Sequence, residues 1–182
     1  MRYVAFLRAI NVGGHTVAME RLRAHFDALG FAHVETFIAS GNVIFETRSK
    51  DAGALEKKIE AHLQKSLGYE VKTFLRSDAD LARIAASQPF PPGNVKAART
   101  LLVGFMEAPL SAGAAKVWLA LKTKEDDFHT KDREVYWLCK DGQGQSKYFN
   151  VSFEKMLETR LTFRSMTTVA KLAAKYPPPT TA

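Results

Sequence analysis

The fold of this chain is decided by one stretch near its start, Arg2-Tyr3-Val4-Ala5-Phe6-Leu7-Arg8-Ala9-Ile10-Asn11-Val12-Gly13-Gly14. Apolar, strand-forming residues run into a Gly-Gly turn, and an amphipathic helix begins near Met19, which predicts a strand-loop-helix unit. Because both faces of the strand are apolar, we expect it to lie centrally in a sheet that is covered on both sides. Arg8 is the exception, and we expect it to point toward the loop 11–14, where a polar site could be built.

The first 76 residues continue as strand, helix, strand, strand, helix, strand. After the opening strand, residue patterns predict a helix over 19–29, strands over 34–38 and 43–47, a helix over 51–67 and a strand over 69–76. This is the order of the split β-α-β unit of ferredoxin-like domains, in which two helices cover one face of an antiparallel sheet. Ser77, with Asp80 three residues later, then predicts a capped short helix.

The run Pro89-Phe90-Pro91-Pro92-Gly93-Asn94 interrupts these patterns, and the same order starts again behind it. The second half is predicted to contain a strand over 99–106, a helix from Ser111 to 121, a hairpin of 125–129 with 134–139, a helix over 146–157, a short strand at 161–163 and a helix over 165–176. The two halves share this pattern without convincing identity of residues. We therefore predict an α+β fold of two ferredoxin-like (βαββαβ) halves with antiparallel sheets and an extra C-terminal helix.

The domain boundaries follow from these patterns. We expect a first ferredoxin-like half with its trailing helix over 1–87, a Pro/Gly linker over 88–98, a second half with the C-terminal helix over 99–176, and a disordered tail over 177–182.

Composition limits the class of protein. Of the 182 residues, 46% are hydrophobic and 10% aromatic, which is enough for a real core. No apolar run approaches the roughly 20 residues of a membrane span, and the first strand lacks the features of a signal peptide, so we expect a cytoplasmic protein with no membrane partner. The single cysteine, Cys139, cannot form an internal disulfide, and we expect it to be a small buried core residue.

The net charge of +7 is compatible with a polyanionic partner such as nucleic acid. Residues 88–182 carry most of the excess, with 14 Lys and Arg against 9 Asp and Glu. However, no run of basic residues occurs, and most of the Lys and Arg lie on the outer faces of predicted helices. An ordinary solvated surface is therefore the alternative reading.

Three segments resemble the signature stretches of the bacterial family DUF1697, a domain of unknown function. They are Leu7-Arg8-Ala9-Ile10-Asn11-Val12-Gly13-Gly14, Ser40-Gly41-Asn42-Val43-Ile44-Phe45 and Thr162-Phe163-Arg164-Ser165-Met166-Thr167-Thr168-Val169-Ala170-Lys171-Leu172. The resemblance spans nearly the full chain and implies a two-part α+β fold, but no established activity. The family usually has Gly in place of Ala9 and Glu158, and Asn-Trp in place of Ser165-Met166, so no role of that indole or amide is carried over.

The loop after the first strand is the first candidate binding site. Gly13 and Gly14, ahead of a helix, could direct backbone N–H groups at an anion with help from Arg8, or could form only a tight structural turn. In a ferredoxin-like order the first and third strands are antiparallel neighbours. Arg8 and Asn11 should then lie near the loop that joins the strands predicted over 34–38 and 43–47, whose candidate ligand residues are Ser40, Gly41 and Asn42. Ser40 and Asn42 could instead be turn residues that bond the local backbone.

A second candidate group precedes and begins the last helix. Arg164 lies just before this helix, Thr168 lies in its first turn, and Lys171 follows three residues later on the same face. Together these residues could bind a phosphate. Arg164 could equally form a salt bridge that pins the helix, and Ser165 or Thr167 could cap it.

Metal and catalytic sites are not predicted. The five histidines show no metal-ligand spacing, and Glu125-Asp126-Asp127 is read as the solvated entry of a strand. We therefore expect no metal and no cofactor. No nucleophile or general base can be named, so catalytic residues are unknown and enzymatic activity is an open question.

Two classes of function are left by this sequence. The first is a protein that binds nucleic acid or another phosphate-bearing ligand, such as an anionic small molecule. The alternative is an enzyme acting on a small phosphorylated or carboxylated metabolite. A basic polar cluster without a titratable partner favours binding. Strands at the sheet edges could also pair with a second copy, which would make a homo-oligomer.

Overall fold

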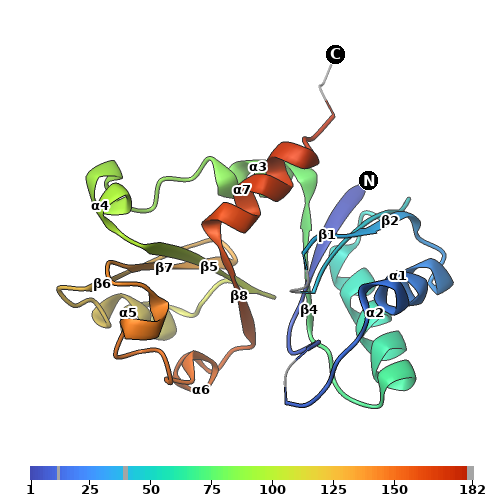
Figure 1. Ribbon diagram of the computed structural model, residues 1–182, viewed down its shortest axis with the longest axis horizontal. Coiled ribbons are helices and arrows are strands. Elements are labelled where there is room, and N and C mark those ends of the chain that lie inside the picture. Colours follow the sequence, from blue (N-terminus) through green and yellow to red (C-terminus); the bar gives the residue numbers. More distant parts are fainter. Residues whose placement is uncertain (12, 39–40, 180–182) are drawn as a thin grey trace. The chain divides into compact units, whose positions relative to one another are not determined.

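The computed structural model describes residues 1–11, 13–38 and 41–179, and Ser40 of the second predicted loop therefore lies outside the described residues. The chain divides into two compact units, one formed by Met1–Ala82 with Leu172–Ala182 and the other by Arg83–Lys171. Each unit contains one four-stranded antiparallel sheet with its helices (Figure 1). The predicted fold class, an α+β fold with two ferredoxin-like halves and a C-terminal helix, is confirmed.

The sheet of the first unit has the strand order β2-β3-β1-β4. In chain order the elements are β1 (Arg2–Leu7), α1 (Met19–Ala28), β2 (Ala32–Thr36), β3 (Asn42–Glu46), α2 (Ala52–Leu67) and β4 (Thr73–Ser77). Strand β1 pairs with β3 on one side and β4 on the other, so that Val4 faces Ile44 and Arg76 in the two ladders. The apolar strand that opens the sequence is therefore central, as its composition predicts.

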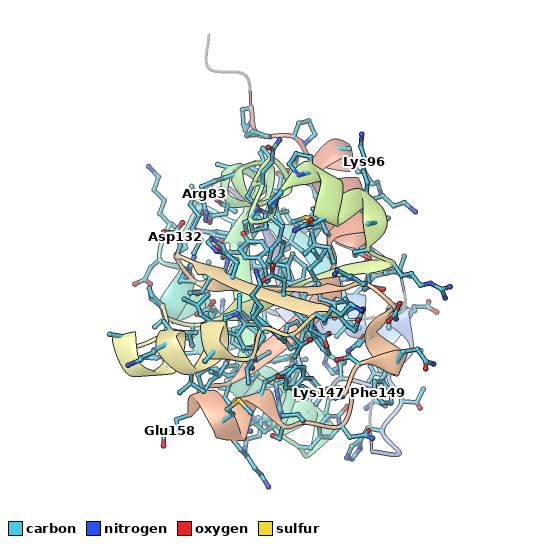
Figure 2. The ribbon with its side chains drawn as sticks, turned by 90° about the vertical axis from the view of Figure 1, so that its left-hand side faces the viewer. Arg83, Lys96, Asp132, Lys147, Phe149 and Glu158 are labelled. Carbon is cyan, nitrogen blue, oxygen red and sulfur yellow. The ribbon has the colours of Figure 1, made fainter. Side chains whose placement is uncertain are left out.

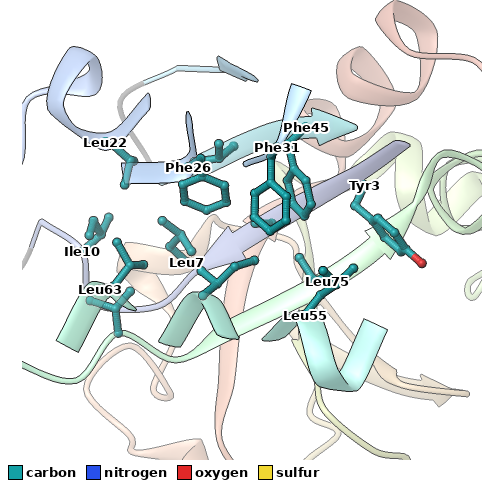
Figure 3. Packing of buried hydrophobic residues seen from close by; sticks show 14 of the residues in the cluster. Tyr3, Leu7, Ile10, Leu22, Phe26, Phe31, Phe45, Leu55, Leu63 and Leu75 are labelled. Carbon is teal, nitrogen blue, oxygen red and sulfur yellow. The ribbon is translucent and has the colours of Figure 1, made fainter. Parts of the chain in front are cut away.

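Helices α1 and α2 cover one face of this sheet, and their apolar stripes build the core of the first unit (Figure 3). The helical repeat places Leu22 and Phe26 of α1 on the same side, and α2 adds residues four apart, Leu55, Ile59 and Leu63. Asp51 caps α2 by accepting a hydrogen bond from the Ala54 N–H at 2.9 Å. The core is thus specified by the same periodicity that predicts the helices.

The last residues of the chain belong to the first unit, not to the unit that precedes them in sequence. Glu35 on β2 accepts hydrogen bonds from Lys175 Nζ at 2.8 Å and Tyr176 Oη at 2.7 Å. The hydrogen bond from Lys175 lowers the pKa of the Glu35 carboxyl below its usual value, and the hydrogen bond from Tyr176 makes the next largest contribution. The Arg2 guanidinium lies 5.7 Å from the centre of the Tyr176 ring. The C-terminal segment is thereby joined to β1 and β2.

The second unit repeats the same sheet order, β6-β7-β5-β8. Its elements are β5 (Thr100–Met106), α5 (Ala112–Ala120), β6 (Asp126–Lys131), β7 (Glu134–Cys139), the 3-10 helix η1 (Gln143–Gln145), α6 (Phe153–Leu157) and β8 (Leu161–Ser165). Trp118 of α5 is completely buried, packs edge-on against Phe128 and donates from Nε1 to the His129 carbonyl at 2.8 Å. Both tryptophans of the chain, Trp118 and Trp137, lie in this core.

Three predicted segments differ from the observed ones. The linker 88–98 contains a short helix, α4 (Pro92–Ala97), because proline suits the first turn of a helix. Only Phe153–Leu157 of the helix predicted over 146–157 is helical, since Ser146 instead directs its hydroxyl oxygen to the Tyr148 N–H at 3.1 Å. Strand β4 begins at Thr73, four residues later than expected.

Each unit ends its sheet with the same junction between a strand and a helix. Arg76-Ser77 ends β4 and is followed by α3 (Asp78–Ala85), and Arg164-Ser165 ends β8 and is followed by α7 (Met166–Lys175). The sequences continue as Leu81-Ala82-Arg83-Ile84-Ala85-Ala86 and Val169-Ala170-Lys171-Leu172-Ala173-Ala174, which match position by position in residue type. The expectation that the halves share no residue-level identity is therefore wrong at these junctions.

Candidate functional site

The end of β1 meets the turn before β3 closely. The Leu7 N–H donates to the Gly41 carbonyl at 2.8 Å, and Phe6 faces Asn42 in the ladder. Gly41 has a φ of +71°, and a Cβ there would lie 2.6 Å from Ile10 Cγ2, so only glycine permits this approach. The sequence argument that these two segments are neighbours thus agrees with the geometry.

The loop that follows β1, residues 8–11 and 13–17, is called the β1 loop below. Asn11 Oδ1 accepts a hydrogen bond from the Val17 N–H at 2.7 Å, which closes the loop on itself. Tyr69 donates from Oη to the Ile10 carbonyl at 3.0 Å and stacks on the His15 ring, with ring centres 3.9 Å apart. The Arg8 N–H donates to the Lys72 carbonyl at 2.8 Å. Asn11 therefore orders the loop with its side-chain oxygen.

Backbone conformations that side chains rarely adopt gather at this meeting point. Ala9 in the β1 loop has a φ of +61°, and Ile38 before the turn has a φ of +51°. A left-handed conformation costs a residue with a Cβ about 1–2 kcal/mol, and such strain often accompanies a functional site. Gly13 and Gly14 also have positive φ, and a Cβ on either would meet no atom within 4 Å. Their backbone is consequently open on the side where a Cβ would stand.

Asn42 occupies a different place from the one a ligand residue needs. Its side chain is completely buried, and its Nδ2 donates to the Phe37 carbonyl at 3.0 Å. Asn42 therefore holds the turn between β2 and β3, which is the structural alternative considered for it. Of the candidates near β1, Arg8 is half-buried and Gly13 and Gly14 are exposed.

The candidates near the last helix lie in the second unit. Arg164 donates from Nη1 to Thr162 Oγ1 at 2.9 Å and to the Phe163 carbonyl at 2.8 Å, and burial lowers the pKa of its guanidinium to about 10. Thr168 donates its N–H to Ser165 Oγ at 3.1 Å, so Ser165 caps α7. Lys171 is exposed. A phosphate site formed by Arg164, Thr168 and Lys171 stays a prediction.

A hollow of about 310 Å³ lies beside the start of β6, at residues for which the sequence predicted no binding role. Asp126 lines it and is only 3% exposed, so the interpretation of this residue as part of a solvated strand entry is wrong. Its Oδ1 accepts a hydrogen bond from Trp137 Nε1 at 2.8 Å and its Oδ2 accepts one from Ser146 Oγ at 3.0 Å. The partners lie 11 and 20 residues further along the chain, and no local pattern marks them.

Cys139 stands opposite Asp126 in the ladder of β6 and β7 and lines the same hollow. Burial, the charge of Asp126 and a hydrogen bond to its carboxylate raise the pKa of the Cys139 thiol to about 12. The thiol is therefore protonated at neutral pH, and it is a poor nucleophile there because only the thiolate is a strong one.

Two features are absent from the part of the chain that the structure describes. There, no three His, Cys, Asp or Glu side chains gather in a way that could hold a metal ion. None of the helices described has the length and apolar character needed to cross a membrane.

The two antiparallel sheets and their helices define an α+β protein with two ferredoxin-like halves. The chain belongs to the family described as "Protein of unknown function (DUF1697)", whose model matches residues 1–136, and the predicted family is thus confirmed. Among solved structures, it is similar to the conserved bacterial protein SP0830 from Streptococcus pneumoniae, with 21% sequence identity and a TM-score of 0.76. The match covers 97% of this chain and 98% of that one, and it concerns the fold alone. The comparison with curated proteins gave no match.

Proposed function

We propose that the protein binds a phosphate-bearing ligand at the β1 loop. The observation that carries this proposal is the combination of a loop fixed by its own contacts with two exposed glycines of open backbone. The hydrogen bond from Val17 to Asn11 and the contacts of Tyr69 restrain the loop before any ligand arrives. A binding loop that is ordered in advance loses less conformational entropy on binding.

The chemistry of the loop suits an anion. Consecutive backbone N–H groups in left-handed or turn conformations form concave sites for phosphate, and Gly13 and Gly14 have such conformations. Helix α1 begins at Met19, shortly after the loop, and directs the positive end of its dipole toward that side. Arg8 at the start of the loop adds a guanidinium, which forms charge-assisted hydrogen bonds with phosphate.

The aromatic side chains described on β1 and β3 do not form an exposed platform for nucleic-acid bases. Tyr3, Phe6 and Phe45, whose positions on β1 and β3 could have suited base stacking, are all buried. A ligand of this protein would therefore be recognised through phosphate groups, which both nucleic acids and small metabolites carry. The experiment has to separate these two sources.

Thermal-shift and calorimetric titrations test the proposal with pyrophosphate, a nucleoside diphosphate and a single-stranded RNA oligonucleotide. We expect at least one of these probes to raise the melting temperature of the wild type, because a ligand that binds only the folded state stabilises it. RNA binding should weaken steeply with salt, as counterion release requires, whereas binding of the diphosphate alone would identify a metabolite site.

Arg8→Gln and Arg48→Gln form the matched pair of variants. Arg48 is exposed in the same unit and follows the opposite end of β3, so its loss should leave binding unchanged. Arg8→Gln should weaken binding by about tenfold or more, as expected for one charged hydrogen bond. A flat response of the wild type to all three probes, or equal binding by the two variants, would refute the proposal.

A further inference from the structure

The hollow beside Asp126 is independent of the β1 loop, since it is built entirely within the second unit. Three segments form its wall: the turn before β6, the end of β7 and the segment after η1. Thr123 fixes the first segment by accepting hydrogen bonds at Oγ1 from the N–H groups of Glu125 and Asp126, at 3.1 and 2.9 Å. The volume of about 310 Å³ falls at the lower end of the range for small-molecule sites.

The carboxylate of Asp126 sits in this wall with unusual partners for a buried charge. Its hydrogen bonds come from the indole of Trp137 and the hydroxyl of Ser146, which are neutral donors, and the thiol of Cys139 stands opposite it in the ladder. Within the described ranges, no lysine, arginine or histidine forms an ion pair with Asp126. Because buried charges are normally paired with an opposite charge, the hollow next to this carboxylate is a favourable place for a cationic group.

The rim of the hollow carries the opposite charge as well. Lys124 and Lys147 are exposed residues of the lining, and Lys147, which is labelled in Figure 2, directly follows in sequence the serine that bonds Asp126. The Lys147 ammonium lies 4.9 Å from the centre of the Tyr148 ring, which keeps it near the segment that forms the wall. With Asp141 and Glu125 also in the lining, positive and negative side chains are nearly balanced.

We propose that this hollow binds a small zwitterion, an α-amino acid or a close derivative, with its ammonium group toward Asp126 and its carboxylate toward Lys147. A purely anionic ligand would meet the three carboxylates of the lining, and a purely cationic one would meet its two lysines. A ligand that carries both charges a few bonds apart satisfies both. The polar neutral groups of Ser146 and Gln145 add hydrogen-bonding capacity between the two ends.

Titration of the ¹⁵N-labelled protein with the standard L-amino acids, followed by amide chemical shifts, tests this assignment. At least one amino acid should move the amide signals of Asp126, Gly142, Ser146 and Lys147 in a saturable way. Its N-acetyl derivative, which lacks the ammonium, and its amide, which lacks the carboxylate, should each bind at least about tenfold more weakly. The probes bind at a place distinct from the β1 loop, so failure here leaves the phosphate proposal untouched.

Lys147→Ala should weaken binding by about tenfold, whereas Lys116→Ala, an exposed lysine of α5 outside the lining, should not. Asp126→Asn should abolish binding, and if this buried variant fails to fold, the Lys147 pair and the two blocked probes still decide the matter. The proposal is overturned if no amino acid moves these amides, or if the blocked derivatives bind as tightly as the zwitterion.

Discussion

The junction between β4 and α3 and the junction between β8 and α7 have the same residues at the turn, yet different surroundings. In both, the arginine donates from Nη1 to the carbonyl of the preceding residue at 2.8 Å, and the serine lies directly before the first residue of the helix. Arg76 is completely buried, whereas Arg164 is half-buried. Identical local residues therefore set the same turn, and the environment decides how much of the arginine is accessible to a ligand.

The caps of the two helices differ in the same direction. Ser77 Oγ accepts the Asp80 N–H at 3.1 Å, and Asp80 Oδ2 accepts the Ser77 N–H at 3.1 Å, so the two residues form the predicted reciprocal capping box. At the second junction Ser165 Oγ accepts the Thr168 N–H, and the two hydroxyls contact each other at 2.9 Å. An ionised carboxylate is the stronger partner, so the first junction is the firmer one.

The largest expected effect is the loss of the buried arginine. Arg76→Ala should lower the free energy of unfolding by about 3 kcal/mol or more, because it removes buried packing and leaves buried acceptors without their donor. Arg164→Ala should cost about half as much. Urea unfolding followed by far-UV circular dichroism and by tryptophan fluorescence measures both, and the fluorescence reports the second unit, which holds Trp118 and Trp137. Equal losses of unfolding free energy in the two variants would contradict the difference in burial effect inferred for the two arginines.

Removal of the serine caps should lower the free energy of unfolding in the same order, more at Ser77 than at Ser165. Ser77→Ala should cost about 1.5–2 kcal/mol, because the Ser77 hydroxyl both accepts the Asp80 N–H and donates to Asp80 Oδ2, and alanine loses both bonds. Ser165→Ala should cost about 1 kcal/mol, and the conservative Ser→Thr changes should recover most of each loss. A larger loss for Ser165→Ala would show that the hydroxyl pair is the stronger cap.

Acidification should affect the first unit more than the second. His25 on α1 and His62 on α2 have ring centres 5.4 Å apart, and their buried Nε2 atoms have no hydrogen-bond partner among the residues that the structure describes. Burial lowers the pKa of His25 from its usual 6.5, and the charges of His62 and Arg21 lower it further. The unfolded chain then binds a proton at a higher pH than the folded one, so stability is full above about pH 6.5 and falls below it.

Melting curves between pH 7.5 and 5.5 measure this effect. The circular-dichroism transition should shift down by a few degrees over that range, and His25→Gln should reduce the shift. His33→Asn is the control, because its side chain is exposed and asparagine tolerates the left-handed backbone at that position. A melting temperature that stays constant over this range in the wild type would contradict the prediction.

The smallest effects are stabilising and concern one residue in each unit. Ala9 and Glu158 have φ values of +61° and +52°, and Glu158, exposed at the end of α6 in Figure 2, is the C-cap of that helix. Replacing either with glycine should raise the free energy of unfolding by about 0.5–1 kcal/mol, since relief of the strain exceeds the added entropy of the unfolded chain. Destabilisation by either change, measured by urea unfolding, would contradict this explanation.

The order of elements could be predicted because each rests on a local pattern. The apolar faces of β1 and the four-residue spacing of Leu55, Ile59 and Leu63 are sufficient for a strand and a helix. The pairing of β1 with β3 follows from the predicted sheet order. The family resemblance indicates glycine at the positions of Ala9 and Glu158, and the structure shows that both residues have a left-handed backbone.

The roles of single polar residues could not be predicted, because distant partners decide them. Asn42 is buried by its tertiary surroundings, and Asp126 becomes a buried acceptor through Trp137 and Ser146, which no local pattern connects to it. Ser146, whose hydroxyl bonds both Asp126 and the nearby Tyr148 N–H, lies outside the helix expected for it. The repeat of the strand–helix junction could not be recognised from the sequence, because the repeated segment is short and only its arginine, serine and alanines are identical.

The contribution of Lys175 and Tyr176 to the first unit has a consequence for synthesis on the ribosome. Chains leave the ribosome N-terminus first, and domains made of continuous segments can fold as they emerge. The first unit here takes strands from the beginning of the chain and its last contacts to Glu35 from the other end. Most of the first unit is therefore translated before the second unit, yet its contacts are completed only after the second unit has been translated.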